Sequence, residues 1–304
     1  MAVAGTQLHV RESGDGPPLL LINGIGAYMK MWTALEAGLP DVRLIAFDAP
    51  GSGRSPSPMV PLPVEMLAQL TDRLLDRLGY DRVDVLGYSF GGLIAQFLAR
   101  QAPARVRRLV LVATTPGWGG VPAPSSSAAQ MSWLVRSTWR QYEWMTERLI
   151  GGGEGGLTDG LPWLSPPPVF GDLWHWLAMA ASPGTLWWLR DLPQQTLVVT
   201  GDEDPLVPVA NGLLLARHIP RARALIAPGE DHFLLMRPTS RAIPAIRSFL
   251  TAGDADRSHA WQSAVVVDDQ MLADRLRAEG EGLIDPVAWM SAIIRKLALA
   301  PRAQ

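Results

Sequence analysis

The sequence of 304 residues contains no cysteine, which excludes disulfide bonds, thiolate metal sites and a cysteine nucleophile. It holds only two lysines, Lys30 and Lys296, so nearly all of its positive charge comes from arginines scattered along the chain. The 27 basic and 29 acidic residues leave a formal net charge of −2, without a basic patch for nucleic acid or anionic lipid. We therefore expect no nucleic-acid partner.

Long apolar runs are also missing. No stretch approaches the about 18 apolar residues that a membrane-spanning helix needs. The first ten residues lack the charged and apolar regions of a secretory signal. These features predict a cytoplasmic protein without a transmembrane segment. Hydrophobic residues nevertheless make up 48% of the chain, which is enough for a large buried core.

Short apolar runs rich in branched residues alternate with helical patterns over the first 115 residues. The runs lie at residues 18–23, 42–47, 82–86 and 107–113, and the helical patterns at 28–39, 63–78 and 91–101. Continuous apolar runs bounded by turn residues are typical of strands buried on both faces of a parallel sheet. The alternation predicts an α/β fold with a mostly parallel, doubly wound sheet.

The alternation stops after residue 115 and resumes with strand-like runs at 195–200 and 222–226 and a helix near 240–250. The intervening residues 116–191 have proline clusters, a GGGEGG segment at 151–156, and nine of the twelve tryptophans. We interpret them as a helical lid inserted in a core that comprises residues 1–115 and 192–252. Residues 253–304 form a predicted helical extension, with helices at 268–279 and 286–300.

The strongest local motif is GYSFGG at residues 87–92, directly after one predicted strand and before a predicted helix. A G-x-S-x-G pattern between a strand and a helix is typical of a nucleophile elbow, in which the serine occupies a strained turn. The flanking glycines fit, because side chains there would collide with the neighbouring strand and helix. Ser89 is therefore the predicted nucleophile.

A serine hydroxyl needs a base to take its proton. Of the five histidines, His232 follows the last predicted strand after a short loop, where the base belongs in a hydrolase with the chain order Ser, Asp, His. The acid that orients the imidazole should come from GDEDPLVP at 201–208. Asp204 is favoured, since the proline after it fixes a turn, while Asp202 and Glu203 remain alternatives.

The oxyanion that forms during acyl transfer needs preorganised N–H donors. The backbone N–H of Phe90, next to the nucleophile, is one candidate. The second is the N–H of Ile25, in the NGIG loop after the first predicted strand of the sheet, which Asn23 could hold by its side chain. The glycine-containing segments 48–55 and 151–156 lack the lysine and the spacing of phosphate-binding loops, so we interpret them as a structural turn and a lid segment.

Four further stretches carry a resemblance: NGIGA at 23–27, AFDAPGSGRS at 46–55, GDEDPLVP at 201–208 and DHFLLMRP at 231–238. With the elbow, they resemble the α/β-hydrolase superfamily over about residues 5–250, most of all the intracellular medium-chain-length poly(3-hydroxyalkanoate) depolymerases. The resemblance implies an α/β-hydrolase fold and a triad of Ser89, His232 and Asp204 that needs no cofactor or metal. It also implies hydrolysis of storage polyester on cytoplasmic granules.

The tryptophan-rich lid bears on the substrate. Nine indoles in about 75 residues exceed what a small helical cap needs for its own core. The surplus would line an apolar tunnel or form a patch that docks on a granule surface. As substrate contacts we predict Trp118, Trp174, His175 and Trp187.

Fold and triad leave competing functions open. An apolar ester or polyester is the expected substrate, with a general carboxylesterase or lipase-like enzyme, or another α/β-hydrolase on small apolar esters, as the alternative. An alternative of another class is a hydrolase fold without catalysis that only binds a small molecule or a granule. The sequence carries no signal for the oligomeric state.

Overall fold

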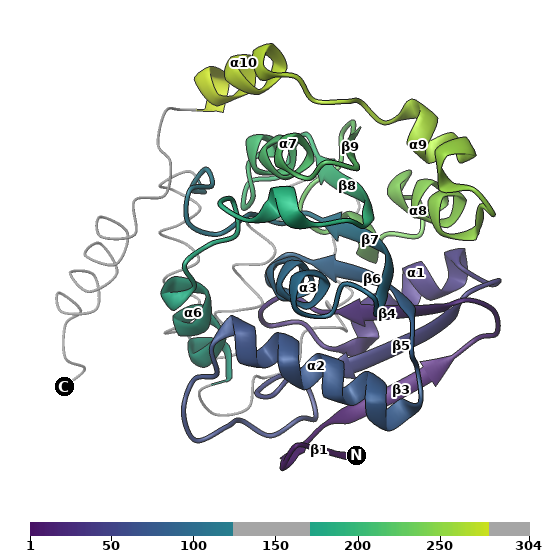
Figure 1. Ribbon diagram of the computed structural model, residues 1–304, viewed down its shortest axis with the longest axis vertical. Helices are drawn as coiled ribbons and strands as arrows, with labels where there is room; N and C mark the ends of the chain where they lie inside the picture. Colours follow the sequence, from purple (N-terminus) through teal and green to yellow (C-terminus); the bar gives the residue numbers. More distant parts are fainter. Residues whose placement is uncertain (124–170, 280–304) are drawn as a thin grey trace, which may run out of the picture.

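Seven strands form one central sheet in the order β3-β5-β4-β6-β7-β8-β9 in the computed structural model, which describes residues 1–123 and 171–279 (Figure 1). Strand β3 (His9–Ser13) runs antiparallel to β5 (Arg43–Asp48), and all other neighbours in this sheet are parallel. The remaining strands of the sheet are β4 (Pro18–Ile22), β6 (Val83–Tyr88), β7 (Val106–Val112), β8 (Gln195–Gly201) and β9 (Ala222–Ala227). The predicted mostly parallel α/β sheet is confirmed. A small ribbon of β1 (Ala2–Val3) and β2 (Thr6–Gln7) precedes it.

Helices cover both faces of the sheet (Figure 1). One face carries α2 (Val64–Leu78), α3 (Phe90–Gln101) and α7 (Val209–His218). The other carries η1 (Met29–Trp32), α1 (Thr33–Gly38), η3 (Leu234–Met236), α8 (Ala242–Thr251) and α9 (His259–Ser263). The sequence pattern at 28–39 predicts a single helix, which the structure divides into η1 and α1.

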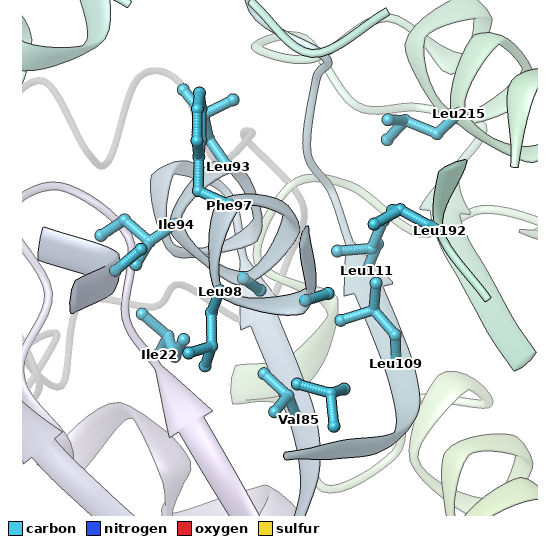
Figure 2. Close-up of a cluster of buried hydrophobic side chains, with 14 of the residues drawn as sticks. Ile22, Val85, Leu93, Ile94, Phe97, Leu98, Leu109, Leu111, Leu192 and Leu215 are labelled. Atoms are coloured by element: carbon cyan, nitrogen blue, oxygen red, sulfur yellow. The ribbon is translucent and has the colours of Figure 1, made fainter. Parts of the chain in front are cut away.

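The two faces of the sheet have separate cores because successive side chains of a strand point to opposite sides. In β4, Leu20 and Ile22 belong to the core beneath α2 and α3, whereas Leu19 and Leu21 belong to the core beneath α1 and α8. Figure 2 shows the first of these cores, where Leu98 of α3 lies near strand residues such as Ile22. A fully buried leucine of this kind stabilises the fold by about 1.5–3 kcal/mol.

The predicted lid and extension are described in part. Within 116–191 the structure describes 116–123 and 171–191, with helix α6 (Gly171–Ala181) and the 3-10 turn η2 (Leu189–Asp191). The GGGEGG segment and the predicted helix at 286–300 lie outside the described residues, and the domain boundaries stay predictions. No helix in the described ranges combines the length and the apolar character required to cross a bilayer.

The chain after residue 252 returns to the sheet. It contains η4 (Ala255–Arg257), α9 and α10 (Asp269–Glu279), and α10 occupies the position of the predicted helix at 268–279. Val265 forms an antiparallel bridge with Ala224 of β9, in which each backbone N–H donates to the other residue's carbonyl, at 2.8 and 2.9 Å. The extension therefore covers part of the edge strand β9, whose N–H and C=O groups would otherwise be exposed.

Candidate active site

Ser89 lies in the tight turn between β6 and α3. Its backbone angles, φ 52° and ψ −122°, fall in a region that residues other than glycine rarely adopt, as expected for a nucleophile elbow. The flanking glycines make this turn possible. A Cβ on Gly91 would lie 2.1 Å from the carbonyl oxygen of Ile22, and a Cβ on Gly87 would lie 2.5 Å from the carbonyl oxygen of Gly91.

His232 follows β9, and its Nε2 lies 3.2 Å from Ser89 Oγ. The imidazole is almost completely buried, with 6% of the side chain exposed. Tyr88, the last residue of β6, holds the base from one side. Its hydroxyl donates to the backbone carbonyl of His232 at 3.1 Å, and its ring centroid lies 5.2 Å from that of the imidazole.

Asp204 follows β8, and its side chain is fully buried. Its Oδ1 accepts the backbone N–H groups of Leu206 and Val207, both at 2.8 Å. Because Oδ1 is held in this way, Oδ2 faces His232 Nδ1 at 2.8 Å. The carboxylate keeps a proton on Nδ1, which leaves the lone pair of Nε2 directed at the Ser89 hydroxyl.

The two alternative acids lie elsewhere. Asp202 Oδ1 accepts the N–H of Gly229 at 2.6 Å, in the turn after β9, and so connects the ends of β8 and β9. The backbone N–H of Glu203 donates to the carbonyl of Glu230 at 3.1 Å. Of the three acids in the GDEDPLVP stretch, the structure brings only Asp204 to His232.

One predicted oxyanion donor follows Ser89 in the chain, and the other belongs to a loop that packs against Ser89. Phe90 is the first residue of α3, so its N–H belongs to the first turn, where backbone N–H groups have no partner within the helix. The other loop abuts the nucleophile, since a Cβ on Gly24 would lie 3.1 Å from Ser89 Cβ, and Ile25 is the next residue. Asn23 Oδ1 accepts the indole N–H of Trp32 at 2.6 Å, which anchors the start of this loop.

Two predicted substrate contacts lie on α6. His175 is buried, its Nε2–H donates to the carbonyl of Pro50 at 2.9 Å, and its ring centroid lies 5.4 Å from that of Phe90. Burial lowers the pKa of this imidazole to about 4, so the ring is neutral. The indole N–H of Trp174 donates to the carbonyl of Pro58 at 3.0 Å. These bonds hold α6 against residues 50–58.

The other two predicted substrate contacts, Trp118 and Trp187, do not belong to α6. The indole N–H of Trp118 donates to the carbonyl of Ala180, joining the chain after β7 to the end of α6. Trp187 is 60% exposed, and the Arg100 guanidinium lies 4.6 Å from its ring. Arg100 is ten residues along α3 from Phe90, about 15 Å at helical rise. The structure does not bring Trp187 to Ser89, and we no longer count it among the substrate contacts.

The sequence prediction missed Asp172, the second residue of α6. Its carboxylate accepts the backbone N–H of Gly26, in the loop that contains Ile25, and its Oδ1 is buried without a hydrogen-bond partner among the described residues. Burial raises the pKa of this carboxyl to about 6. An acid in the first turn of a helix is ordinary, so the sequence offers no signal that this one is buried near the nucleophile.

The arrangement can perform nucleophilic chemistry on a carbonyl. It contains a hydroxyl, an imidazole within hydrogen-bonding distance of it, a buried carboxylate behind the imidazole, and the Gly24 loop packed against the serine. Within residues 1–123 and 171–279 no three histidine, aspartate or glutamate side chains are grouped so that they could hold a metal ion.

Comparison with known proteins places this chain among hydrolases. A family model described as "alpha/beta hydrolase fold" matches residues 17–155, and one described as "TAP-like protein" matches residues 181–261. The chain is 36% identical over 242 residues to a poly(3-hydroxyalkanoate) depolymerase from Ectopseudomonas oleovorans. The aligned residues cover 77% of this chain and 84% of that protein.

Two further relatives are similar over most of their length. A 2-hydroxymuconate semialdehyde hydrolase from Pseudomonas sp. (strain CF600) is 28% identical, over 83% of this chain and 93% of that protein. A solved structure of a thermophilic esterase from Thermogutta terrifontis superposes with a TM-score of 0.68 at 26% identity, over 82% of this chain and 95% of that one.

Proposed function

The chain belongs to the α/β-hydrolase family, and from that premise we propose that it hydrolyses carboxylic esters through Ser89, His232 and Asp204. The observation that carries the proposal is the hydrogen-bonded line from Ser89 Oγ through the imidazole of His232 to the carboxylate of Asp204. As the substrate we propose medium-chain poly(3-hydroxyalkanoate) and its oligomers.

The first half of the reaction acylates the serine. The Nε2 of His232 takes the proton of Ser89 Oγ as this oxygen bonds to the ester carbonyl carbon. The carbonyl oxygen becomes negative and accepts hydrogen bonds from the N–H groups of Phe90 and Ile25. The bond to the alcohol oxygen then breaks, the alcohol leaves with the proton held on Nε2, and the acyl group remains on Ser89.

The second half releases the acid. Water gives a proton to His232 Nε2 while its oxygen attacks the acyl carbon, and the same N–H groups stabilise the second oxyanion. The proton then returns to Ser89 Oγ as the bond to the serine breaks. In both halves the imidazole becomes positively charged, and the buried carboxylate of Asp204 stabilises it.

The polyester substrate is supported by one relative and by the composition of the lid. The relative named as a poly(3-hydroxyalkanoate) depolymerase is 36% identical to this chain over 242 residues. Long aliphatic side chains of a polyester need apolar surface, and residues 116–191 hold nine tryptophans. Four of these nine, Trp133, Trp139, Trp144 and Trp163, lie outside the described residues. Since such a polymer is insoluble in water, we propose that the enzyme acts at a granule surface.

A second candidate is the hydrolysis of a carbon–carbon bond. The 28% identical 2-hydroxymuconate semialdehyde hydrolase favours it, and a serine triad is compatible with it. A third candidate function is that of a general carboxylesterase, which would use the same triad on small apolar esters.

The decisive experiment combines two assays on the same preparations. Wild type should clear a medium-chain polyester latex and hydrolyse nitrophenyl esters, best at medium chain length. Ser89→Ala should lose both activities by a factor on the order of 10⁶, because the triad acts as a unit. Ser263→Ala, an exposed serine in α9, is the matched control and should behave as wild type.

Other outcomes would redirect the proposal. Good turnover of short soluble esters without latex clearing would favour the general carboxylesterase. Turnover of a meta-cleavage dienoate with no turnover of esters would favour the carbon–carbon hydrolase. If a fluorophosphonate probe labels Ser263→Ala but not Ser89→Ala, Ser89 is the nucleophile. If the probe does not label wild type, a binding protein without catalysis is favoured.

A further inference from the structure

Asp172 has a buried acceptor atom that nothing in the described part of the chain satisfies. One side of its carboxylate accepts the N–H of Gly26, while Oδ1 is buried without a partner. Burying an oxygen away from water without a hydrogen-bond donor lowers the stability of the fold, and the cost is larger for a charged oxygen. Such a group is expected where a ligand supplies the missing donor.

The position of this carboxylate is defined by the loop that holds the predicted oxyanion donor. Gly26 is the neighbour of Ile25, and a Cβ on Gly24 would lie only 3.1 Å from Ser89 Cβ. Because consecutive Cα atoms are about 3.8 Å apart, the hydrogen bond to Gly26 brings the carboxylate to within a few ångströms of the Ile25 backbone. The carboxylate of Asp172 therefore lies close to the loop that would hold the carbonyl oxygen of a bound ester.

Helix α6 is held firmly at this point. A Cβ on Gly51 would lie 2.9 Å from the Cα of Gly171, so the backbone before Asp172 is in direct contact with the loop after β5. One turn further along α6, His175 donates its Nε2–H to the carbonyl of Pro50. These two contacts fix the first turn of α6 against the loop after β5.

His175 supplies a second unpaired acceptor. Since its Nε2 carries the proton that bonds to Pro50, its Nδ1 carries a lone pair, and Nδ1 is buried without a partner in the described ranges. Residues three apart lie on the same face of a helix. We call Asp172 and His175 the α6 acceptor pair.

The chemistry of the α6 acceptor pair selects its ligand. Above a pH of about 6, where the carboxyl of Asp172 is ionised, both free atoms accept hydrogen bonds and neither donates, so the ligand must bring a donor. A carboxylate, a carbonyl or an ether oxygen would face lone pairs only. A neutral hydroxyl supplies one O–H donor, which can satisfy either the carboxylate oxygen or the imidazole nitrogen, and the charged carboxylate forms the stronger hydrogen bond.

We propose that the α6 acceptor pair binds the free 3-hydroxyl of the acyl unit that is transferred to Ser89, so that the enzyme removes units from the hydroxyl end of the polyester. The inference rests on the proposed ester hydrolysis and names the substrate feature that the site recognises. In an interior unit the same oxygen is esterified and has no hydrogen to donate. Only the terminal unit, and free 3-hydroxyacyl esters, can make this bond.

The test uses three nitrophenyl esters of one chain length: the 3-hydroxyoctanoate, the 3-methoxyoctanoate and the octanoate. The methoxy ester keeps the oxygen and its inductive effect but cannot donate. Wild type should prefer the hydroxy ester over the methoxy ester by about 10- to 100-fold in kcat/KM, the range expected for a hydrogen bond to a charged acceptor. This comparison needs no variant.

Asp172→Asn and Asp191→Asn extend the test. Asparagine keeps an acceptor for the N–H of Gly26 but replaces the carboxylate, so Asp172→Asn should lower the hydroxy-to-methoxy ratio about tenfold or more. Asp191 is an exposed acid of η2, and its variant should keep the wild-type ratio. A purely structural role of Asp172 in the loop would lower kcat for all three esters equally and leave the ratio unchanged.

The outcomes distinguish a failure of hydroxyl recognition from a failure of ester hydrolysis. Equal kcat/KM for the three esters in wild type, or an unchanged ratio in Asp172→Asn, would overturn the hydroxyl inference while ester hydrolysis stands. Failure to hydrolyse any of the three esters, or full activity in Ser89→Ala, would overturn the proposed function itself.

Discussion

The proposed triad and the α6 acceptor pair are both buried polar groups near Ser89, but they differ in how their atoms are paired. In the triad, Asp204 Oδ1 holds two backbone N–H groups and Oδ2 holds His232 Nδ1. On α6, Asp172 Oδ1 and His175 Nδ1 have no partner in the described part of the chain. A fully paired network is rigid before substrate arrives, whereas unpaired acceptors cost free energy until a ligand satisfies them.

This difference assigns the two regions to different tasks. Preorganised groups stabilise charge that develops during the reaction, because they need no rearrangement when it appears. Unpaired groups discriminate between ligands, because a ligand that lacks the matching donor leaves them unsatisfied. Changes in the triad should therefore affect every substrate, and changes in the α6 acceptor pair should affect the choice among substrates.

The largest expected effect comes from the acid of the triad. Asp204→Asn should lower kcat about 10⁴-fold, since an amide at this position favours the wrong imidazole tautomer, as in other serine triads. Asp202→Asn is the matched control. It changes an acid two residues away that binds the N–H of Gly229, so kcat should fall less than tenfold. A larger loss in Asp202→Asn than in Asp204→Asn, measured on a soluble nitrophenyl ester, would contradict our assignment of the acid.

The next effect concerns the pH dependence of stability at Asp172. Its pKa is about 6 in the folded protein against an ordinary 3.8, so the folded state binds this proton more tightly than the unfolded state. The stabilisation by the proton is complete below pH 3.8 and is lost as the pH rises through 6. Above pH 7 the ionised carboxylate costs on the order of 3 kcal/mol. Asp172→Asn should be more stable than wild type at pH 8 and equal to it near pH 4.

His175 should show the opposite dependence. Its pKa is about 4 in the folded protein against an ordinary 6.5, so below pH 6.5 the unfolded state gains a proton that the buried ring does not take up. The free energy of unfolding should fall by on the order of 3 kcal/mol as the pH drops from 6.5 to 4. His175→Gln should remove this loss and gain stability relative to wild type at pH 4.5.

Urea unfolding of wild type and both variants between pH 4.5 and 8 measures these slopes. Between pH 4 and 6 the two residues act in opposite directions, so they offset each other in wild type and separate only in the variants. Asp191→Asn controls for the loss of an exposed acid. Stability differences that do not change with pH would show that burial shifts neither the pKa of Asp172 nor that of His175.

The smallest effect is expected at Trp187, the predicted substrate contact that the structure places away from Ser89. Trp187→Ala removes an exposed indole beside the Arg100 guanidinium, an interaction worth about 0.5–1 kcal/mol at a surface site. The midpoint of urea unfolding should shift slightly, and kcat/KM on nitrophenyl octanoate should stay within twofold of wild type. A tenfold loss of kcat/KM would restore Trp187 to the substrate site.

Much of the site follows from local patterns in the sequence. The predicted strands coincide with β4 to β9 because strands buried on both faces must be continuous apolar runs. Parallel strands end at one edge of the sheet, so residues that directly follow β6, β8 and β9 come close in space. This is why Ser89, the acids at 202–204 and His232 could be named as a group from their positions alone.

Sequence position does not show which of these acids pairs with His232. Asp202, Glu203 and Asp204 all follow β8, and spacing does not separate them. The backbone turn after Asp204 does, because it directs the N–H groups of Leu206 and Val207 at one carboxylate oxygen and leaves the other for the imidazole. Our sequence preference for Asp204 agrees with this geometry, and its catalytic role remains a prediction for the kinetics to test.

Local patterns predict the order of the strands along the chain, the elbow and the loops that carry the polar groups, since each depends on neighbours within a few residues. Only the folded chain shows that α6 packs on the loops at 26 and 50, that Asp172 and His175 are buried there, and that Val265 covers the edge of β9. The difference comes from burial. Whether a carboxylate is solvated or stripped of water depends on segments far away in the chain, and no local pattern contains that information.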